Sequence, residues 1–162
     1  INTGKTNMPF CIGGHPAFLV PDAKKGEPLT GSLTWDNNAP ERLYGNVNGC
    51  LAKGYHKVAT PDGVWNFTEN DFEDDALIFD RSQLHHVELL DKDNKPVVQL
   101  DFKAPAVGIW SPSGKHAPFV CIEPWYGIHD WAEFEGNFQE KYLMNQLLPG
   151  SSFMSEYIIT IG

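Results

Sequence analysis

Apolar residues occur along this chain in short bursts that alternate with polar ones. Each burst is bounded by glycine, proline, asparagine or aspartate, and β-branched and aromatic residues are frequent within it. Short alternating bursts are typical of strands rather than helices. The pattern therefore predicts an all-β fold, an antiparallel β-sandwich, with strands at 9–12, 32–35, 64–67, 76–79, 86–90, 97–102, 107–110, 118–122, 141–147 and 153–161.

Three local units stand out. The stretch HVELLDKDNKPVVQLDF has two alternating runs around the polar residues 91–95, which predicts a hairpin. Thr68, followed by several acids, predicts a short helical turn, whereas 21–31 has the composition of a loop. In the last segment, alternation places four residues on one face and predicts a strand that closes the sheet: Phe153, Tyr157, Ile159 and Ile161.

Length and charge narrow the class of protein. A chain of 162 residues can bury roughly 70% of its unfolded surface, enough for one domain spanning 1–162. Twelve basic and twenty-one acidic residues give a net charge of −9, and the basic residues are scattered, so a nucleic-acid partner is not expected. No apolar run approaches the ~20 residues that span a bilayer, so a soluble protein without a membrane partner is expected.

The cysteines carry no recognisable framework. Cys11, Cys50 and Cys121 are odd in number, far apart and without a C-x-x-C spacing. Neither a disulfide scaffold nor a thiolate metal site is therefore expected. Reduced thiols of this kind predict a cytoplasmic protein.

Familiar catalytic signatures are absent from the sequence. It contains no H-E-x-x-H, no glycine-rich phosphate loop and no G-x-S-x-G elbow. One junction is nevertheless unusual: in CIGGHPAF, two glycines free the backbone, and Pro16 biases His15 toward an extended conformation. A histidine held in this way can act as a general acid or base near neutral pH. It could equally serve only to satisfy loop carbonyls.

The second unusual junction is VCIEPWYG. Glu123 follows four apolar residues, and burial would raise the pKa of its carboxyl group, as suits a general base. Trp125 and Tyr126 supply flat apolar faces of the kind that pack against a pyranose ring. The alternative interpretation is a structural carboxylate among core aromatic residues.

Other polar clusters are less specific. Asp74 and Asp75 precede the apolar run ALIF, where acids can accept hydrogen bonds from sugar hydroxyls, although solvated turns often look the same. His85 and His86 are adjacent, so on a strand they point to opposite faces and cannot share a metal ion. No metal site is expected. His129 and Asp130 form a possible loop pair near Glu123.

Five ordered blocks together resemble the C-terminal half of the aldose 1-epimerase, or galactose mutarotase-like, family, in its bacterial G-G-H-P-A-F and E-P-W-Y-G branch. The blocks cover nearly the whole chain: CIGGHPAF, FEDDALIF, VGIWS, PFVCIEPWYGIHD and EKYLMNQLLPGSSFMSEYIITI. The resemblance implies a large antiparallel β-sandwich that interconverts the α and β anomers of a hexose without a cofactor or metal.

The resemblance also assigns roles. It implies that Glu123 takes the proton of the anomeric hydroxyl while His15 protonates the ring oxygen. It implies that Asp75 binds the sugar, with Asp74 beside it as a competing choice, and that Trp125 stacks on or walls the sugar. Ring opening requires an acid and a base on opposite sides of one acetal carbon, each with a suitable pKa. His15 and Glu123 are therefore expected to face each other across a sugar-sized gap.

Members of this family carry an additional N-terminal half that supplies an arginine and a second histidine, and no counterpart precedes Ile1. The chain is therefore expected to be either part of a longer mutarotase-like domain or a subunit that dimerises, because half a sandwich leaves sheet edges uncovered. A carbohydrate-binding β-sandwich without turnover is the alternative function, and a purely structural domain is the third.

Overall fold

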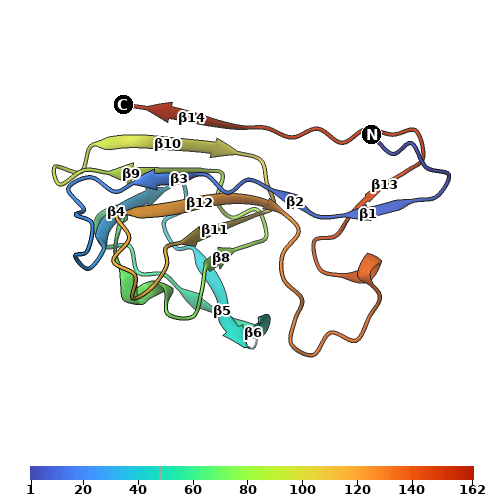
Figure 1. The fold of residues 1–162 in the computed structure, drawn as a ribbon, viewed down its shortest axis with the longest axis horizontal. Helices are drawn as coiled ribbons and strands as arrows, with labels where there is room; N and C mark the ends of the chain where they lie inside the picture. The colour runs from blue at the N-terminus through green and yellow to red at the C-terminus, as the bar shows by residue number, and fades with distance from the viewer. Residues whose placement is uncertain (48) are drawn as a thin grey trace.

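The computed structural model describes residues 1–47 and 49–162, and it is built almost entirely of strands and loops (Figure 1). Three short 3-10 helices are present among these residues: η1 (Pro61–Gly63), η2 (Glu69–Phe72) and η3 (Phe138–Glu140). The strands are β1 (Met8–Phe10), β2 (Ile12–Gly13), β3 (Ala17–Leu19), β4 (Thr30–Trp35), β5 (Glu41–Val47), β6 (Cys50–Lys57), β7 (Val64–Thr68), β8 (Leu77–Phe79), β9 (His86–Leu90), β10 (Pro96–Phe102), β11 (Ala106–Trp110), β12 (Phe119–Tyr126), β13 (Asn145–Leu147) and β14 (Tyr157–Ile161).

Two antiparallel sheets form a sandwich. The first has the strand order β14-β10-β9-β4-β7, and the second has the order β2-β12-β11-β8, with β3 pairing to another part of β12. The antiparallel sandwich predicted from the sequence is thus confirmed, and the chain has the all-β class expected of it.

Alternating side chains of the two sheets make the main core. In β10 the buried positions are Val98, Leu100 and Phe102, and the residues between them are partly exposed. Side chains from both sheets join one apolar cluster, and every one of these positions follows the period of two that strands require. The buried cluster includes Leu33, Trp35, Trp65, Phe67, Leu77, Phe79, Val87, Leu89, Val107, Ile109, Val120 and Ile122.

Strands β11 and β12 are buried on both faces. Positions Val120–Pro124 of the chain are all buried, which no half-exposed strand would show. Their outer face is covered by a second apolar cluster that includes Leu43 and Leu51 from the β5–β6 hairpin and Ile128 from the loop after β12. A carboxylate on this outer face therefore lies between a sheet and a covering layer.

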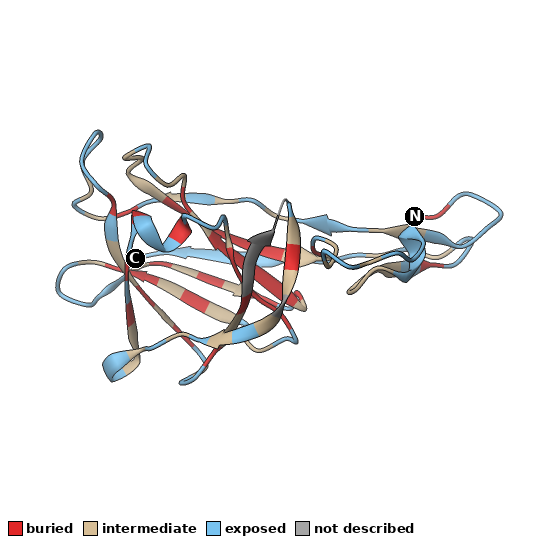
Figure 2. Cartoon of the chain, turned by 90° about the horizontal axis from the view of Figure 1, so that it is seen from below, coloured by how far each residue is buried: buried red, intermediate tan, exposed pale blue. Residues whose placement is uncertain are grey.

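Strands β1 and β13 pair and extend away from the sandwich as an arm (Figures 1 and 2). The amide of Asn145 ties the arm to the sheet, because its Nδ2 donates to the carbonyl oxygens of Phe10 at 3.0 Å and Tyr126 at 2.8 Å. Within the described part of the chain, no helix has the length and apolar character needed to cross a membrane.

Two local predictions from the sequence are confirmed. The 86–102 hairpin is confirmed, with β9 and β10 joined through a turn in which the Asp91 N–H donates to Lys95. The helical turn after Thr68 is confirmed as η2, closed by a capping box between Thr68 and Asp71.

Other predictions were wrong in extent. The strand expected at 141–147 is limited to β13, because Leu143 has a left-handed φ of 56° that interrupts any ladder before Asn145. The strand expected at 153–161 begins only at Tyr157, and all five residues of β14 are exposed, so this strand adds an edge rather than a covered face. The β5–β6 hairpin and the short strand β3 were not predicted.

Candidate active site

The site is built on alternate residues of β12. Val120 and Ile122 point into the main core, so Cys121, Glu123 and Trp125 point to the opposite, outer face of the sheet. Glu123 is only 4% exposed. The apolar run that precedes it is therefore a central strand, and the carboxylate at its end is a buried group on the face away from the inter-sheet core.

His15 is held beside Glu123 by the strands on either side of it. Strand β2 pairs with Trp125 and Tyr126, while β3 pairs with residues 119–121 of the same strand β12. The intervening link is fixed by two hydrogen bonds, from the Gly14 N–H to the Pro124 carbonyl at 2.9 Å and from the Ile122 N–H to the Pro16 carbonyl at 3.2 Å. As a result, His15 Nε2 lies 3.4 Å from Glu123 Oε1.

A cavity of about 430 Å³ opens at this pair. His15, Glu123 and Trp125 lie on its wall, and His129, Phe138 and Lys141 also contribute to it. Small-molecule sites commonly occupy about 300–1,000 Å³, with apolar walls and a few placed polar groups. The structure thus brings the predicted acid, base and aromatic residue into one hollow of suitable size. The pair is closer than expected, because the two groups are in contact rather than separated by a sugar-sized gap.

The electrostatics of Glu123 favour a proton-accepting role. Burial raises the pKa of its carboxyl group, and this effect outweighs the opposing effects of the His15 charge and of a hydrogen bond from the Trp125 side chain. The indole N–H, the one donor of a tryptophan side chain, therefore orients the carboxylate. A carboxyl group whose pKa is raised holds a proton more readily, which suits a group that must accept one from a sugar hydroxyl.

Glycine at 108 makes room for the Trp125 ring. Gly108 faces Glu123 across the β11–β12 ladder. A Cβ atom at this position would lie 2.6 Å from both Cη2 and Cζ2 of Trp125, well inside van der Waals contact. Gly13, opposite Trp125 on β2, is crowded in the same way, with Trp125 Cδ1 at 2.6 Å. The indole is thus held flat against the backbone of two neighbouring strands.

Of the neighbouring acids Asp74 and Asp75, it is Asp75 whose charge affects the pKa of Glu123. Its negative charge contributes to the raised pKa of Glu123. Asp75 is exposed and adopts a left-handed φ of 77°, a conformation that aspartate tolerates better than most residues. Its Oδ1 accepts a hydrogen bond from the Ala76 N–H at 2.9 Å, which fixes the turn into β8. Asp75 is not among the described residues that line the cavity, so its effect on Glu123 is electrostatic.

Sequence reasoning missed the far wall of the cavity. Lys141 Nζ lies 3.4 Å from Asp130 Oδ2 and 5.5 Å above the ring of Phe138, and its side chain is only 17% exposed. The contacts of His129 and Asp130 differ from the predicted pairing of these two residues. Asp130 pairs with Lys141, whereas the ring of His129 lies near that of Trp125, with centroids 6.2 Å apart. No spacing in the sequence predicts these contacts, since residues 128–143 contain no regular element longer than the short helix η3.

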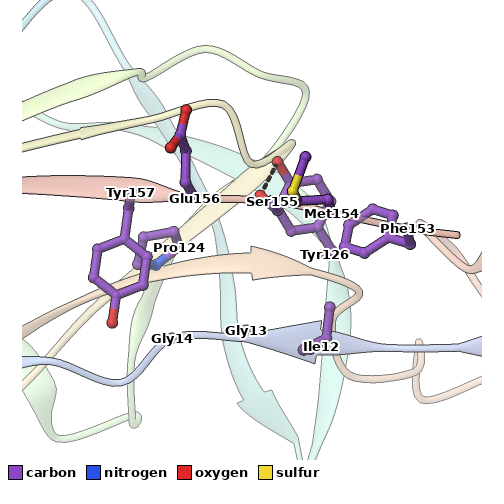
Figure 3. Close-up of a pocket in the computed structure, with 10 residues that line it drawn as sticks. All are labelled: Ile12, Gly13, Gly14, Pro124, Tyr126, Phe153, Met154, Ser155, Glu156 and Tyr157. Carbon is purple, nitrogen blue, oxygen red and sulfur yellow. Dashed lines mark hydrogen bonds between the residues drawn. The ribbon is translucent and has the colours of Figure 1, made fainter. Parts of the chain in front are cut away.

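A larger cavity of about 580 Å³ lies on the other side of β2 (Figure 3). Pro124 and Tyr126 point into it, opposite to Glu123, and the segment 153–157 forms its other wall. The hydroxyls of Ser155 and Tyr126 are hydrogen-bonded there at 2.8 Å. Glu156 is the only acidic residue among those that line this cavity, and no histidine accompanies it, so the smaller cavity is the better candidate for acid–base chemistry.

Comparisons with known proteins agree with this architecture. No protein-family model matches the chain. A solved galactose mutarotase related enzyme from Lactobacillus acidophilus is 30% identical and superposes with a TM-score of 0.84, covering 100% of this chain and 55% of that one. The chain has the galactose mutarotase-like fold. A galactose mutarotase-like protein from Lactobacillus casei shares this fold at 24% identity, with a TM-score of 0.74 over 98% of this chain and 54% of that one.

The relationship extends to curated sequences. The chromosomal protein LacX of Lactococcus lactis is 30% identical over 175 aligned residues, which cover 99% of this chain and 54% of LacX. The chain thus spans about half the length of the curated relatives it matches. The resemblance indicated by the sequence blocks is confirmed, and the galactose mutarotase-like fold of the chain supports a function related to carbohydrates.

Proposed function

We propose that this chain carries the acid–base pair of an aldose 1-epimerase-like isomerase that interconverts the α and β anomers of a hexose. The observation that carries the proposal is the contact of 3.4 Å between His15 Nε2 and Glu123 Oε1 at the wall of the 430 Å³ cavity. The anomeric oxygen and the ring oxygen of a sugar are bonded to the same carbon, C1. An acid and a base that serve these two oxygens must therefore lie close together.

In this proposal the Glu123 carboxylate takes the proton of the anomeric hydroxyl. The C1–O1 bond becomes a carbonyl, the C1–O5 bond breaks, and O5 receives a proton from the His15 imidazolium. Rotation about the C1–C2 bond presents the other face of the carbonyl. The protons then return by the reverse path: His15 takes the proton of the O5 hydroxyl as O5 attacks C1, and Glu123 returns its proton to O1.

The surrounding residues support these steps. Trp125 donates to Glu123 and lies flat on the sheet, where its ring can contact the apolar face of a sugar. Asp75 is exposed and in this proposal offers a carboxylate to sugar hydroxyls, and its charge favours the protonated form of Glu123 during turnover. These residues act without assistance from any cofactor in the proposal.

The test is the rate at which freshly dissolved α-D-glucose or α-D-galactose reaches anomeric equilibrium, followed by polarimetry. Glu123→Gln and His15→Asn should each slow the catalysed rate by about 10²–10⁴-fold, the range expected for loss of a general acid or base. Rates unaffected by both substitutions would refute the assignment.

Glu69→Gln is a matched control. Glu69 is also buried and contacts a partly exposed histidine, with His116 Nδ1 at 2.9 Å from its Oε2, but this pair does not line the cavity. The control should keep the rate within about twofold. Binding of sugar without acceleration of mutarotation by the wild-type protein would instead support the alternative function, a carbohydrate-binding sandwich.

Association with further protein surface is also part of the proposal. All five residues of β14 are exposed at a sheet edge, and Ile158 and Ile161 are 57% and 69% exposed. Such an edge can be covered by a second copy of the chain or by additional sequence of the kind that its longer relatives contain. Sedimentation velocity at several concentrations tests the first possibility. A cytoplasmic location agrees with the three free cysteines and remains part of this proposal.

A further inference from the structure

Cys121 adds a third metal-binding group to the site. A ring nitrogen of His15, the Sγ of Cys121 and a carboxylate oxygen of Glu123 all lie within 4.8 Å of one another. Cys121 and Glu123 are alternate residues on the same face of β12, and His15 is brought to them by β2 and β3. The sequence spacing does not predict this group, because only the pairing of these strands brings its members close together.

The geometry suits a tetrahedral ion. With zinc-to-ligand distances of about 2.0–2.3 Å and tetrahedral angles, the ligand atoms are about 3.3–3.7 Å apart. The nitrogen-to-oxygen distance between His15 and Glu123 is 3.4 Å, so this pair already has the spacing of two zinc ligands. Because all three donors lie within 4.8 Å, small rotations of the side chains suffice to complete the set.

The chemistry of the donors also fits. Imidazole, thiolate and carboxylate are the three side-chain ligands that zinc uses. A neutral histidine, one thiolate and one carboxylate together neutralise the two positive charges of the ion, so the occupied site carries no net charge. This matters because Cys121 and Glu123 are 1% and 4% exposed, and an uncompensated charge at such positions is costly.

Access is provided from the cavity. The His15 side chain is 63% exposed, and His15 and Glu123 both line the hollow, with Cys121 buried behind them. An ion entering from the cavity would meet the nitrogen and the oxygen first and the sulfur behind them. Three protein ligands leave the fourth position facing the cavity, where water can bind.

We propose that His15, Cys121 and Glu123 form a binding site for a divalent transition metal ion of the zinc class, and that the bound ion blocks the acid–base pair. The metal takes the lone pairs of the imidazole and the carboxylate, so neither group can transfer a proton to or from a sugar. The binding site stands on its own geometry, whereas the inhibitory consequence depends on the isomerase function proposed above.

Binding requires proton release. Burial raises the pKa of the Cys121 thiol to about 12, so the sulfur is protonated in the metal-free protein near neutral pH. The metal replaces this proton, which passes to solvent, as it does at other thiolate sites. Affinity should therefore rise with pH across the neutral range.

The experiment uses Co²⁺ as the probe, because cobalt bound to a thiolate gives a sulfur-to-metal charge-transfer absorption. The starting variant carries Cys11→Ser and Cys50→Ser, which leaves Cys121 as the only thiol among the three of the chain. Addition of Co²⁺ to this variant should produce the charge-transfer band together with the visible bands of a tetrahedral ion, and Zn²⁺ should displace them.

Two further substitutions in this background decide the assignment. Cys121→Ala should remove the charge-transfer band, and His15→Asn, at an exposed position, should weaken binding by roughly tenfold or more. No band in the starting variant, or an unchanged band after Cys121→Ala, would overturn the site. If circular dichroism shows that Cys121→Ala is unfolded, His15→Asn decides, and an unchanged affinity overturns the proposal.

Activity is measured separately. Zn²⁺ should slow mutarotation, and a chelator should restore it. Cobalt binding without any effect of Zn²⁺ on an active enzyme would refute the inhibitory role. The absence of basal mutarotation would count against the proposed function, and the cobalt titration would still decide whether the metal site exists.

Discussion

Gly108→Ala tests how tightly the Trp125 ring is fitted to the sheet. The added Cβ would lie 2.6 Å from two ring carbons of Trp125, whereas carbon atoms in contact are normally about 3.5–4.0 Å apart. The indole must therefore move by about 1 Å, or the strand must yield. Overpacking of this kind costs roughly 1–3 kcal/mol of unfolding free energy. Moving the ring would also disturb its hydrogen bond to Glu123.

The measurement is urea denaturation in two backgrounds. In the wild-type background Gly108→Ala should destabilise by the amount just given. In a Trp125→Leu background the clash partner is gone, and alanine should be neutral or stabilising by up to about 1 kcal/mol, because glycine inside a strand is unfavourable relative to alanine. A change of sign between backgrounds is therefore expected. Equal costs in both backgrounds would show that the Trp125 ring is not what requires glycine at this position.

Three further predictions concern other parts of the molecule. Asp80→Ala should lower the free energy of unfolding in urea by about 3 kcal/mol, because the buried Asp80 carboxylate accepts hydrogen bonds from two phenols, one of them Tyr142 at 3.0 Å. A decrease of less than about 1 kcal/mol would contradict this prediction. Burial opposes protonation of His86, but hydrogen bonds to carboxylates such as Asp101 outweigh this effect and raise the pKa of His86. The contribution of protonated His86 to stability is therefore complete below the ordinary histidine pKa and is lost as pH rises through the raised pKa. The stability difference between wild type and His86→Gln should shrink correspondingly with rising pH, and a pH-independent difference would refute it. Ile159→Lys on the exposed strand β14 should reduce aggregation measured by light scattering, with little change in unfolding free energy.

Stability also offers a check on Glu123. Its pKa is raised in the folded protein, so folding is favoured when the carboxyl group is protonated and is progressively less favoured as pH rises from the unfolded pKa to the folded one. Glu123→Gln should therefore keep or increase unfolding free energy at neutral pH while activity is lost. A variant that is both inactive and unstable would leave Trp125 packing, rather than proton transfer, as the explanation.

Sequence analysis singled out residues that the structure brings together, but it did not predict what surrounds them. His15 and Glu123 stand in short stretches whose local chemistry is unusual, and Trp125 follows directly in the same strand, so a resemblance based on these blocks could place all three. The contact of His15 with Glu123 depends on β2 and β3 pairing with different parts of β12, and that pairing is a tertiary feature.

The covering layer could not be predicted in this way. Strands β5 and β6 contain scattered apolar residues among polar ones, and among their described side chains Leu43 and Leu51 reach the second apolar cluster. Near the carboxyl end of the chain, Phe153 was predicted to begin a strand. Its ring instead packs against those of Phe10 and Tyr126, at centroid distances of 5.0 and 5.1 Å. Apolar residues that are used for packing between loops carry no periodic signal.

Pairing of β2 and β3 with β12 has a consequence for the order of events during folding. About one hundred residues separate His15 from Glu123, so the two can meet only after a loop of that length has closed. On a ribosome, an amino-terminal portion emerging first would have no partner strand for these residues until β12 had been synthesised. Refolding followed by Trp125 fluorescence should accordingly report a late step, slower than formation of the local β9–β10 hairpin.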